Sequence, residues 1–181
     1  MQKTDTRVQY TKARFADAML NLLEQQPIGT VSVKALCEQA GLNRGTFYLH
    51  YSEPMDVLHE MEWALYERVV IDLGSFGSGG IESRFREQLA ALGKERRLCA
   101  AVIGRNGDPL FMHRIGDRVY EALREKLQSA HPERSEAEIR ALLSFLFAGC
   151  TGVISAWLGG NGLSDEETAN LLAHLCDSVM Q

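Results

Sequence analysis

The stretch NRGTFYLHY, residues 43–51, holds the side chains whose types and spacing are chemically most informative. Arg44 carries a planar guanidinium that can donate two hydrogen bonds to the edge of a guanine. Thr46 offers a hydroxyl group to a phosphate and a methyl group to a thymine, while Tyr48 and His50 can donate hydrogen bonds to phosphate oxygens. These residue types suit contact with nucleic acid, provided that one helix presents them together.

Two short helices joined by a tight turn are predicted to position these side chains. The pattern predicts helices over residues 32–40 and 43–50, with Gly41 at the turn, where a positive φ is often needed. Phe47 and Tyr51 lie four residues apart on one face of the second helix and are expected to pack inward. The start of this helix and its other face are then left for binding. Such a pair of helices has the pattern of a helix-turn-helix unit, and an ordinary helical hairpin with tyrosine and histidine on its surface is the alternative.

Helical periodicity continues through the rest of the chain, and no segment competes with it as a strand. The sequence therefore predicts an all-α protein with a small N-terminal unit, residues 1–52, and a larger helical bundle, residues 75–181. A helix over 54–73 connects the two, and the glycine-rich stretch 74–80 is expected to be a linker. The remaining helices are expected at 10–25, 81–92, 95–103, 110–130, 135–159 and after Ser164.

Composition is that of a globular protein, with 45% hydrophobic and 24% charged residues in a chain of 181. The net charge of −5 is uneven, because residues 1–52 carry +2 and the remainder carries −7, which hints that the N-terminal end meets a polyanion. The four cysteines lie far apart, without the spacing of a metal site, and are expected to be free thiols in a reducing cytoplasm.

One apolar segment raises the question of a membrane. Residues 141–160 contain no charged residue, and that length can span a bilayer. Several glycines, two serines and a threonine, with an acidic stretch soon afterwards, favour instead a helix buried in the core or at a subunit interface.

The run TVSVKALCEQAGLNRGTFYLHYSEPMDVL resembles the N-terminal DNA-binding domain of TetR-family transcriptional regulators. The residues that carry the resemblance are Thr30, Val31, Leu36, Ala40-Gly41-Leu42, Gly45-Thr46-Phe47-Tyr48 and Tyr51. The helical remainder resembles the ligand-binding and dimerisation domain of the family in layout. The pair FAGCTGVISAWL and LSDEETANLL is similar to the last two helices of one subgroup.

The resemblance implies which residues face DNA. They are Ser32, Lys34, Asn43, Arg44, Gly45, Thr46, Tyr48, Leu49 and His50. Two departures matter. Cys37 replaces a usual alanine inside the motif, and, more seriously, Pro54 stands where many members carry a phosphate-binding lysine, with Glu53 beside it. The loss of a cation and the gain of an anion are expected to weaken attraction to the DNA backbone. A co-regulator that binds DNA weakly, or not at all, and acts through a partner protein therefore stays open as an alternative.

The expected function is that of a cytoplasmic, bacterial-type regulator, most simply a repressor that binds a palindromic double-stranded DNA operator as a homodimer. A small-molecule effector is expected to bind an apolar cavity in the bundle. Its candidate contacts are Trp63, Tyr66, Phe111, His113 and Tyr120. The last two helices offer small residues for close approach and apolar area for self-association. The candidate interface residues are Phe145, Gly149, Gly152, Trp157, Leu172, Leu175 and Val179.

Enzymatic chemistry finds little support in the sequence. His113, His131 and His174 have no evident nucleophile or acid partner, and the glycine-rich stretch lacks the residues of a phosphate-binding loop. Asp56-x-x-His59 has the spacing of one half of a carboxylate-bridged metal pair, but no second half follows. We therefore expect no enzyme activity, no cofactor and no metal site.

Overall fold

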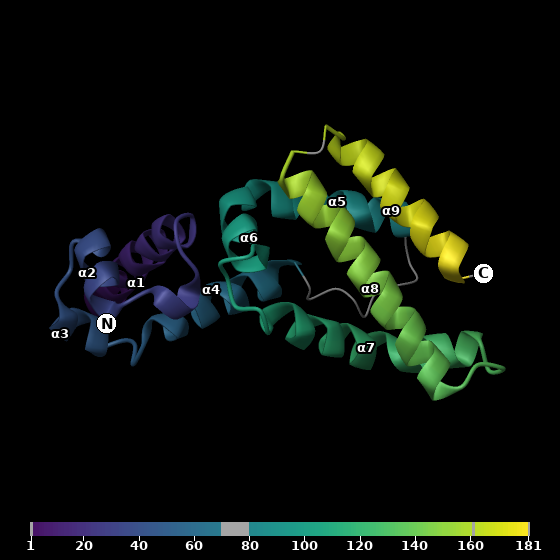
Figure 1. The fold of residues 1–181 in the computed structure, drawn as a ribbon, viewed down its shortest axis with the longest axis horizontal. Helices are drawn as coiled ribbons and strands as arrows, with labels where there is room; N and C mark the ends of the chain where they lie inside the picture. The colour runs from purple at the N-terminus through teal and green to yellow at the C-terminus, as the bar shows by residue number, and fades with distance from the viewer. Residues whose placement is uncertain (1, 70–79, 161, 181) are drawn as a thin grey trace. The chain divides into compact units, whose positions relative to one another are not determined.

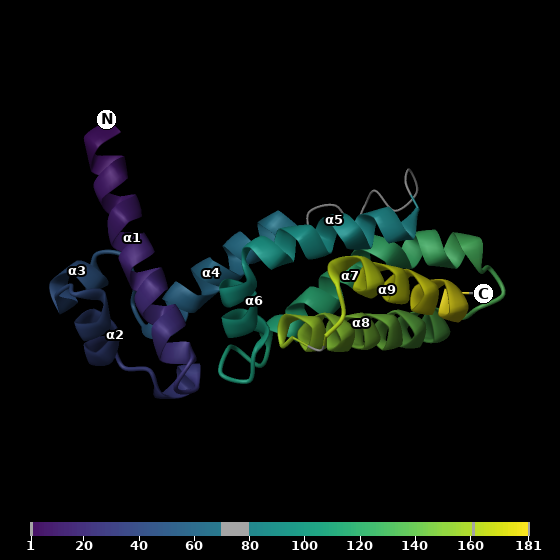
Figure 2. The ribbon, with the colours of Figure 1, turned by 90° about the horizontal axis from the view of Figure 1, so that it is seen from above.

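The computed structural model describes residues 2–69, 80–160 and 162–180, and within these ranges every regular element is helical (Figures 1 and 2). The prediction of an all-α fold is confirmed. The elements are α1 (Gln2–Leu23), the short 3₁₀ helix η1 (Ile28–Thr30), α2 (Val33–Ala40), α3 (Arg44–Tyr48), α4 (Pro54–Val69), α5 (Ile81–Lys94), α6 (Arg96–Ile103), α7 (Phe111–Ala130), α8 (Glu136–Leu158) and α9 (Asp165–Met180).

Two compact units make up the chain, and neither is a continuous segment. The first contains Met1–Leu65 and Arg97–Pro109, and the second contains Tyr66–Arg96 and Leu110–Gln181. The helix-turn-helix segment thus shares its unit with most of α6 and the loop that follows. Most of the expected linker, residues 74–79, lies outside the described residues.

Aromatic and aliphatic side chains from α1 to α4 form the core of the first unit. Phe15, Met19, Leu36, Phe47 and Leu58 are completely buried. The rings of Phe15 and Phe47 meet edge to face, with 5.4 Å between their centroids. The helix-turn-helix is therefore fixed to α1 by packing, because a helix as short as α3 is not stable alone.

The second unit is built from helices that pack pairwise: α5 against α9, and both α7 and α9 against α8 (Figure 2). One of its apolar clusters joins Tyr120 and Leu127 of α7 to Ile139 and Leu143 of α8. Arg96 anchors the end of α8, because its Nη1 donates to the carbonyl oxygens of Trp157 and Leu158 at 3.2 and 2.8 Å.

Several helix boundaries differ from those expected. The first helix begins at Gln2 instead of near residue 10, and the second helix of the helix-turn-helix ends at Tyr48 instead of His50. At this early end, the amides of His50 and Tyr51 both donate to the Phe47 carbonyl, at 2.9 and 3.0 Å. This tighter turn brings the Tyr51 ring to 5.7 Å from that of Phe47.

The apolar helix α8 is long and apolar enough to cross a membrane by length and composition alone. Only 11% of its most apolar window is fully buried inside the chain, and exposed residues such as Phe145 leave one face of the helix uncovered. The four cysteines are free thiols, as expected, and Cys37, Cys99 and Cys176 are buried.

Candidate nucleic-acid interface

The turn between α2 and α3 is fixed by a glycine and an arginine. Gly41 ends α2 in the left-handed conformation, with φ +65°. Arg14 of α1 donates from Nε and Nη2 to the carbonyl oxygen of Ala40, at 3.0 and 2.6 Å. The carbonyl that the end of α2 leaves without a helical partner is thus satisfied by a charged donor. The sequence analysis missed Arg14, which lies 26 residues from Ala40 along the chain.

Side-chain caps start both helices of the unit. The hydroxyl oxygen of Ser32 accepts from the amide of Ala35 at 3.1 Å. Oδ1 of Asn43 accepts from the amide of Thr46 at 2.8 Å and from its hydroxyl at 3.2 Å. Ser32 and Asn43 therefore already have a structural role, and contact with DNA would add to it.

The inward face of α3 is anchored by two aromatic residues, as predicted. Phe47 is fully buried, and Tyr51 is only 7% exposed. The hydroxyl of Tyr51 donates to Oε2 of Glu60 at 3.1 Å, and Nζ of Lys12 lies 2.8 Å from the same oxygen. Burial, with the nearby Glu60 carboxylate, raises the pKa of Tyr51 well above its ordinary range. The hydroxyl thus remains a donor, and α3 stays tied to α1 and α4.

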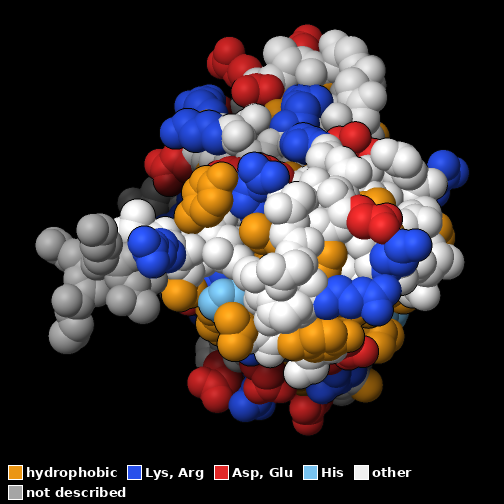
Figure 3. Space-filling view, turned by 90° about the vertical axis from the view of Figure 1, so that its left-hand side faces the viewer, with side chains coloured by type: hydrophobic (Ala, Val, Ile, Leu, Met, Phe, Trp, Pro, Cys, Tyr) orange, Lys and Arg blue, Asp and Glu red, His pale blue; other side chains and the backbone are white. Residues whose placement is uncertain are grey.

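The outward residues of the helix-turn-helix lie on a surface open to solvent. Tyr48 and Leu49 are 59% and 79% exposed, which is unusual for side chains with so much apolar area. Thr46 and His50 are half-buried. The remaining predicted DNA contacts are all exposed: Ser32, Lys34, Asn43, Arg44 and Gly45. Figure 3 is turned so that α2 and α3 face the viewer, and Lys and Arg side chains are spread among acidic ones on the face that it shows.

The start of α4 differs from the rest of this surface in having few backbone amides available to bind a phosphate. Oδ2 of Asp56 accepts from the amides of Ser52 and Glu53, at 2.7 and 3.0 Å. Pro54 has no amide hydrogen to donate. Two of the backbone donors that a helix start can offer to a phosphate are thus occupied, and a third is missing.

The candidate effector contacts occupy different environments. Trp63 belongs to the first unit and is 51% exposed, and His113 of the second unit is also exposed. Tyr66 is half-buried, beneath the guanidinium of Arg118. Phe111 and Tyr120 are buried, and the Tyr120 hydroxyl donates to Oε1 of Glu136 at 3.1 Å. Tyr120 thereby helps to join α7 to α8.

The candidate interface residues divide into two groups. Trp157 and Leu172 are 2% and 0% exposed, so they form part of the subunit's own core. Nε1 of Trp157 donates to Oδ1 of Asp165 at 3.1 Å, which fastens α8 to the start of α9. By contrast, Phe145 is 65% exposed and Leu175 is 43% exposed. Gly149 and Gly152 are exposed as well, and Val179 is half-buried.

Comparison with known proteins gives a consistent result along the chain. Residues 16–61 match the family described as bacterial regulatory proteins, tetR family. Residues 81–178, more than half of the chain, match a transcriptional regulator C-terminal region of the same family. The HTH-type transcriptional regulator AcrR of Shigella flexneri is 31% identical over 72 residues, which are 40% of this chain and 33% of AcrR. The match thus spans about a third of that relative's length.

Solved structures share the fold over nearly the whole chain. A TetR transcriptional regulator from Streptococcus agalactiae is 20% identical, with a TM-score of 0.68, and the match covers 96% of this chain and 97% of that one. The fatty acid degradation regulator FadR from Bacillus halodurans is 15% identical, with a TM-score of 0.63 and 94% of each chain covered. The solved structures show a shared fold, and the two family matches establish that the chain belongs to the TetR family of DNA-binding transcriptional regulators.

Proposed function

We propose that the protein is a ligand-responsive repressor that binds a palindromic operator as a homodimer in the cytoplasm. The observation that carries the proposal is the exposed outer surface of α3, which presents Arg44, Tyr48 and Leu49 from a helix anchored on its other side by Phe47 and Tyr51. A rigid helix with exposed donors can enter a major groove without a large loss of conformational entropy.

The proposed contacts have separate roles. Arg44, in the first turn of α3, supplies the bidentate donor that distinguishes guanine from other bases. Gly45 lets the backbone approach the DNA closely, and Tyr48 and His50 donate to phosphate oxygens. Lys34 lies on the exposed side of α2, where its ammonium group can reach the DNA backbone. Base recognition would therefore depend mainly on Arg44.

The exposed face of α8 supports the homodimer. A stripe at helical spacing runs along it through Ala141, Phe145, Ala148, Gly152 and Ala156, all exposed. Small side chains allow a second helix to approach closely, and a two-fold axis would repeat the same contacts on both subunits. Two recognition helices related in this way read an inverted repeat.

An effector would act by binding more tightly to the conformation that does not fit the operator. Among its candidate contacts, Tyr66, Phe111 and Tyr120 are the most suitable, because all three belong to the second unit and are at least half-buried.

A second candidate function is favoured by the start of α4. Asp56 occupies the Ser52 and Glu53 amides, and Pro54 brings neither an amide donor nor a positive charge. A protein that makes fewer phosphate contacts is attracted less strongly to the DNA backbone. The net charge of +2 over residues 1–52 is too small to compensate for the lost contacts. In that case the protein would act through a partner regulator rather than directly on DNA.

Selection of bound duplexes from a random DNA pool, at about 0.1 M salt, separates the two candidates. The expected result is an enriched inverted repeat. Arg44→Ala should weaken binding to that repeat by about 1–3 kcal/mol and relax the preference at one base pair per half-site. Equal weakening on all sequences would instead make Arg44 a phosphate contact.

Arg105→Ala is the matched control. Arg105 is exposed and belongs to the first unit, but it lies in the loop after α6. This loop contacts the end of α1, through the Asn106 amide bonded to the Leu23 carbonyl. The control should keep the operator preference. No enrichment with the unaltered protein would favour the co-regulator, and Pro54→Lys would then be expected to restore binding.

A further inference from the structure

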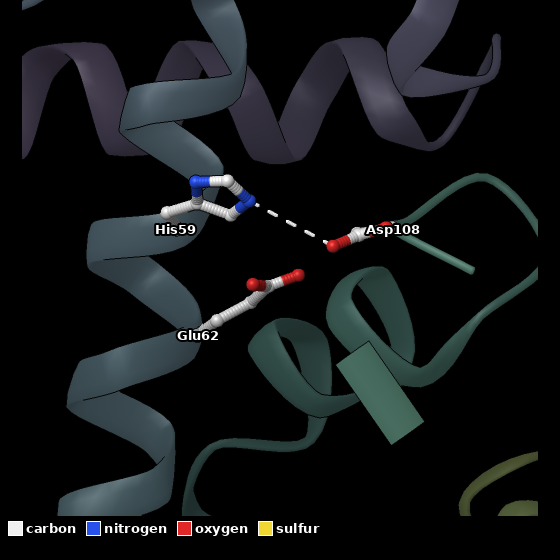
Figure 4. Close-up of side chains that lie close together, drawn as sticks. All are labelled: His59, Glu62 and Asp108. Atoms are coloured by element: carbon white, nitrogen blue, oxygen red, sulfur yellow. Dashed lines mark ion pairs between the residues drawn. The ribbon is translucent and has the colours of Figure 1, made fainter. Parts of the chain in front are cut away.

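Three potential metal ligands meet in the first unit, although the sequence predicted no metal site. His59 and Glu62 lie three residues apart on α4 and point to the same side, and Asp108 approaches them from the loop before α7 (Figure 4). One ligand atom from each residue lies within 4.8 Å of the other two. Nε2 of His59 is 3.7 Å from Oδ2 of Asp108, which is longer than a hydrogen bond.

Burial makes this cluster unlike a solvated group of surface charges. Glu62 is 3% exposed and Asp108 is 8% exposed, whereas the His59 side chain is 51% exposed. Two carboxylates close together in a region of low dielectric repel each other, and each loses hydration. A cation between them would offset both effects, and the exposed side of the cluster gives it a path from solvent.

The loop that carries Asp108 is fixed in position. The Asn106 carbonyl accepts from the Ile28 amide at 2.8 Å, and its side-chain amide donates to the Leu23 carbonyl at 2.7 Å. A Cβ atom on Gly107 would lie 2.6 and 2.7 Å from the carbonyl oxygens of Val102 and Ala101, so only glycine fits there. The backbone that presents Asp108 to α4 is therefore held in place by contacts within the protein that do not depend on a bound ligand.

The donor set indicates which ions fit. One imidazole nitrogen and two carboxylate oxygens, without a thiolate, suit zinc or a similar first-row divalent ion better than magnesium or copper(I). Zinc binds such atoms at about 2.0–2.2 Å, which places ligand atoms about 3.4 Å apart in a tetrahedral site. The separation of His59 Nε2 from Asp108 Oδ2, 3.7 Å, is close to this value, and the other ligand-atom separations are at most 4.8 Å. A rotamer adjustment of the exposed His59 would shorten the separations that involve its imidazole, and water can complete the coordination.

We propose that His59, Glu62 and Asp108 bind one divalent transition-metal ion, which joins α4 to the loop between α6 and α7. Such an ion would link two segments of the unit that contains the helix-turn-helix. From the sequence, only Asp56 had the spacing of a metal-binding partner for His59. In the structure, the Asp56 carboxylate instead accepts hydrogen bonds from the Ser52 and Glu53 amides at the start of α4.

The test is a calorimetric titration of the chelator-treated full chain with zinc chloride, and separately with manganese and magnesium chloride. We expect one zinc ion per chain, weaker binding of manganese and the weakest binding of magnesium. His59→Ala should lower zinc affinity at least tenfold, because it removes one of the three protein ligands. Because His59 is exposed, its removal should not disturb the core. Glu62→Gln should abolish the rise in melting temperature that zinc causes.

His131→Ala is the matched control, because His131 also lies near a carboxylate, with 3.4 Å between its Nδ1 and Oε1 of Glu133, but on an exposed loop. This control should bind zinc like the unaltered chain. The proposal fails if zinc does not bind, if His59→Ala leaves the affinity unchanged, or if both histidine variants weaken binding equally. Magnesium binding as tight as that of zinc would overturn the choice of ion.

Discussion

At the scale of single residues, Gly41 is constrained in two ways. Its φ of +65° lies in the left-handed region, and a Cβ atom there would approach Nη2 of Arg14 to 2.9 Å. Arg14 cannot easily move away, because the same nitrogen donates to the Ala40 carbonyl. The turn of the helix-turn-helix therefore depends on the absence of one side chain.

Gly41→Ala should accordingly lower the free energy of unfolding by about 1–2 kcal/mol, the cost of a left-handed conformation for a residue with a Cβ atom. Urea unfolding followed by circular dichroism measures the change. Gly29→Ala is the control, since its φ is not positive and its Cβ would meet nothing within 4 Å. An equal loss in both variants would contradict the argument from turn geometry.

Residue roles could be predicted from the sequence only where their cause is local. The role of Gly41 was found because a turn depends on a few adjacent residues. Arg14 and Asp108 were missed, because each acts on a partner far along the chain: Ala40 for Arg14, and His59 and Glu62 for Asp108. No periodicity in the sequence reports such a pairing.

At the scale of helices, α8 and α9 begin with the same arrangement, a capping box formed by a serine and a glutamate. The amide and hydroxyl of Ser135 both donate to Oε2 of Glu138, each at 2.7 Å, and the Glu138 amide donates back to the hydroxyl oxygen. Ser164 and Glu167 repeat this arrangement, with distances of 2.9 and 2.7 Å to Oε2. Each pair satisfies donors that a helix start leaves without partners.

These caps predict a dependence of stability on pH. The hydrogen bonds from the serine amide and hydroxyl lower the pKa of Glu138 and of Glu167 below the ordinary value of about 4.5. Their stabilisation is therefore fully present above pH 4.5 and is lost as the pH falls through the lowered values. The double variant Glu138→Gln and Glu167→Gln should be less stable than the unaltered chain at pH 7, and the difference should shrink towards pH 3.

Urea unfolding at pH 7, 5, 4 and 3 would measure this convergence. Glu87→Gln serves as the control, since Glu87 is exposed on α5 and lies outside the capped turns. Its effect should not change with pH. A gap between the double variant and the unaltered chain that stays constant down to pH 3 would contradict the role of the carboxylates.

Helix positions were predicted better than helix ends. The predicted helices over 81–92, 110–130 and 135–159 agree with α5, α7 and α8 to within about two residues, because amphipathic periodicity and caps mark them. The end of α3 was wrong by two residues, since it is set by Tyr51, whose ring packs against Phe15 and Phe47. Tertiary packing here overrides the local pattern.

At the scale of the whole molecule, the uncovered face of α8 should determine the oligomeric state. A Cβ atom on Gly149 would meet nothing within 4 Å in the single chain, so a larger side chain can be accommodated when the subunit stands alone. In a dimer that packs α8 against a partner helix, the same side chain would separate the subunits.

Gly149→Arg should therefore convert a dimer into a monomer while the helical content is retained. Light scattering at micromolar concentration gives the mass, for which one chain contributes 20.2 kDa. Ala122→Arg adds the same charge at an exposed position on α7 and should leave the dimer intact. A monomeric mass for the unaltered protein would contradict the proposed dimer.

The division of the chain into two interleaved units also limits how this protein can be recombined. The backbone passes between the units three times, after Leu65, Arg96 and Pro109. A helix-turn-helix cut out as one N-terminal piece would leave behind Arg97, paired with Glu24 at 2.8 Å, and Asn106, bonded to Leu23 and Ile28. Exchange of DNA-binding modules between relatives, in evolution or by design, must therefore transfer the α6 segment together with the N-terminal helices.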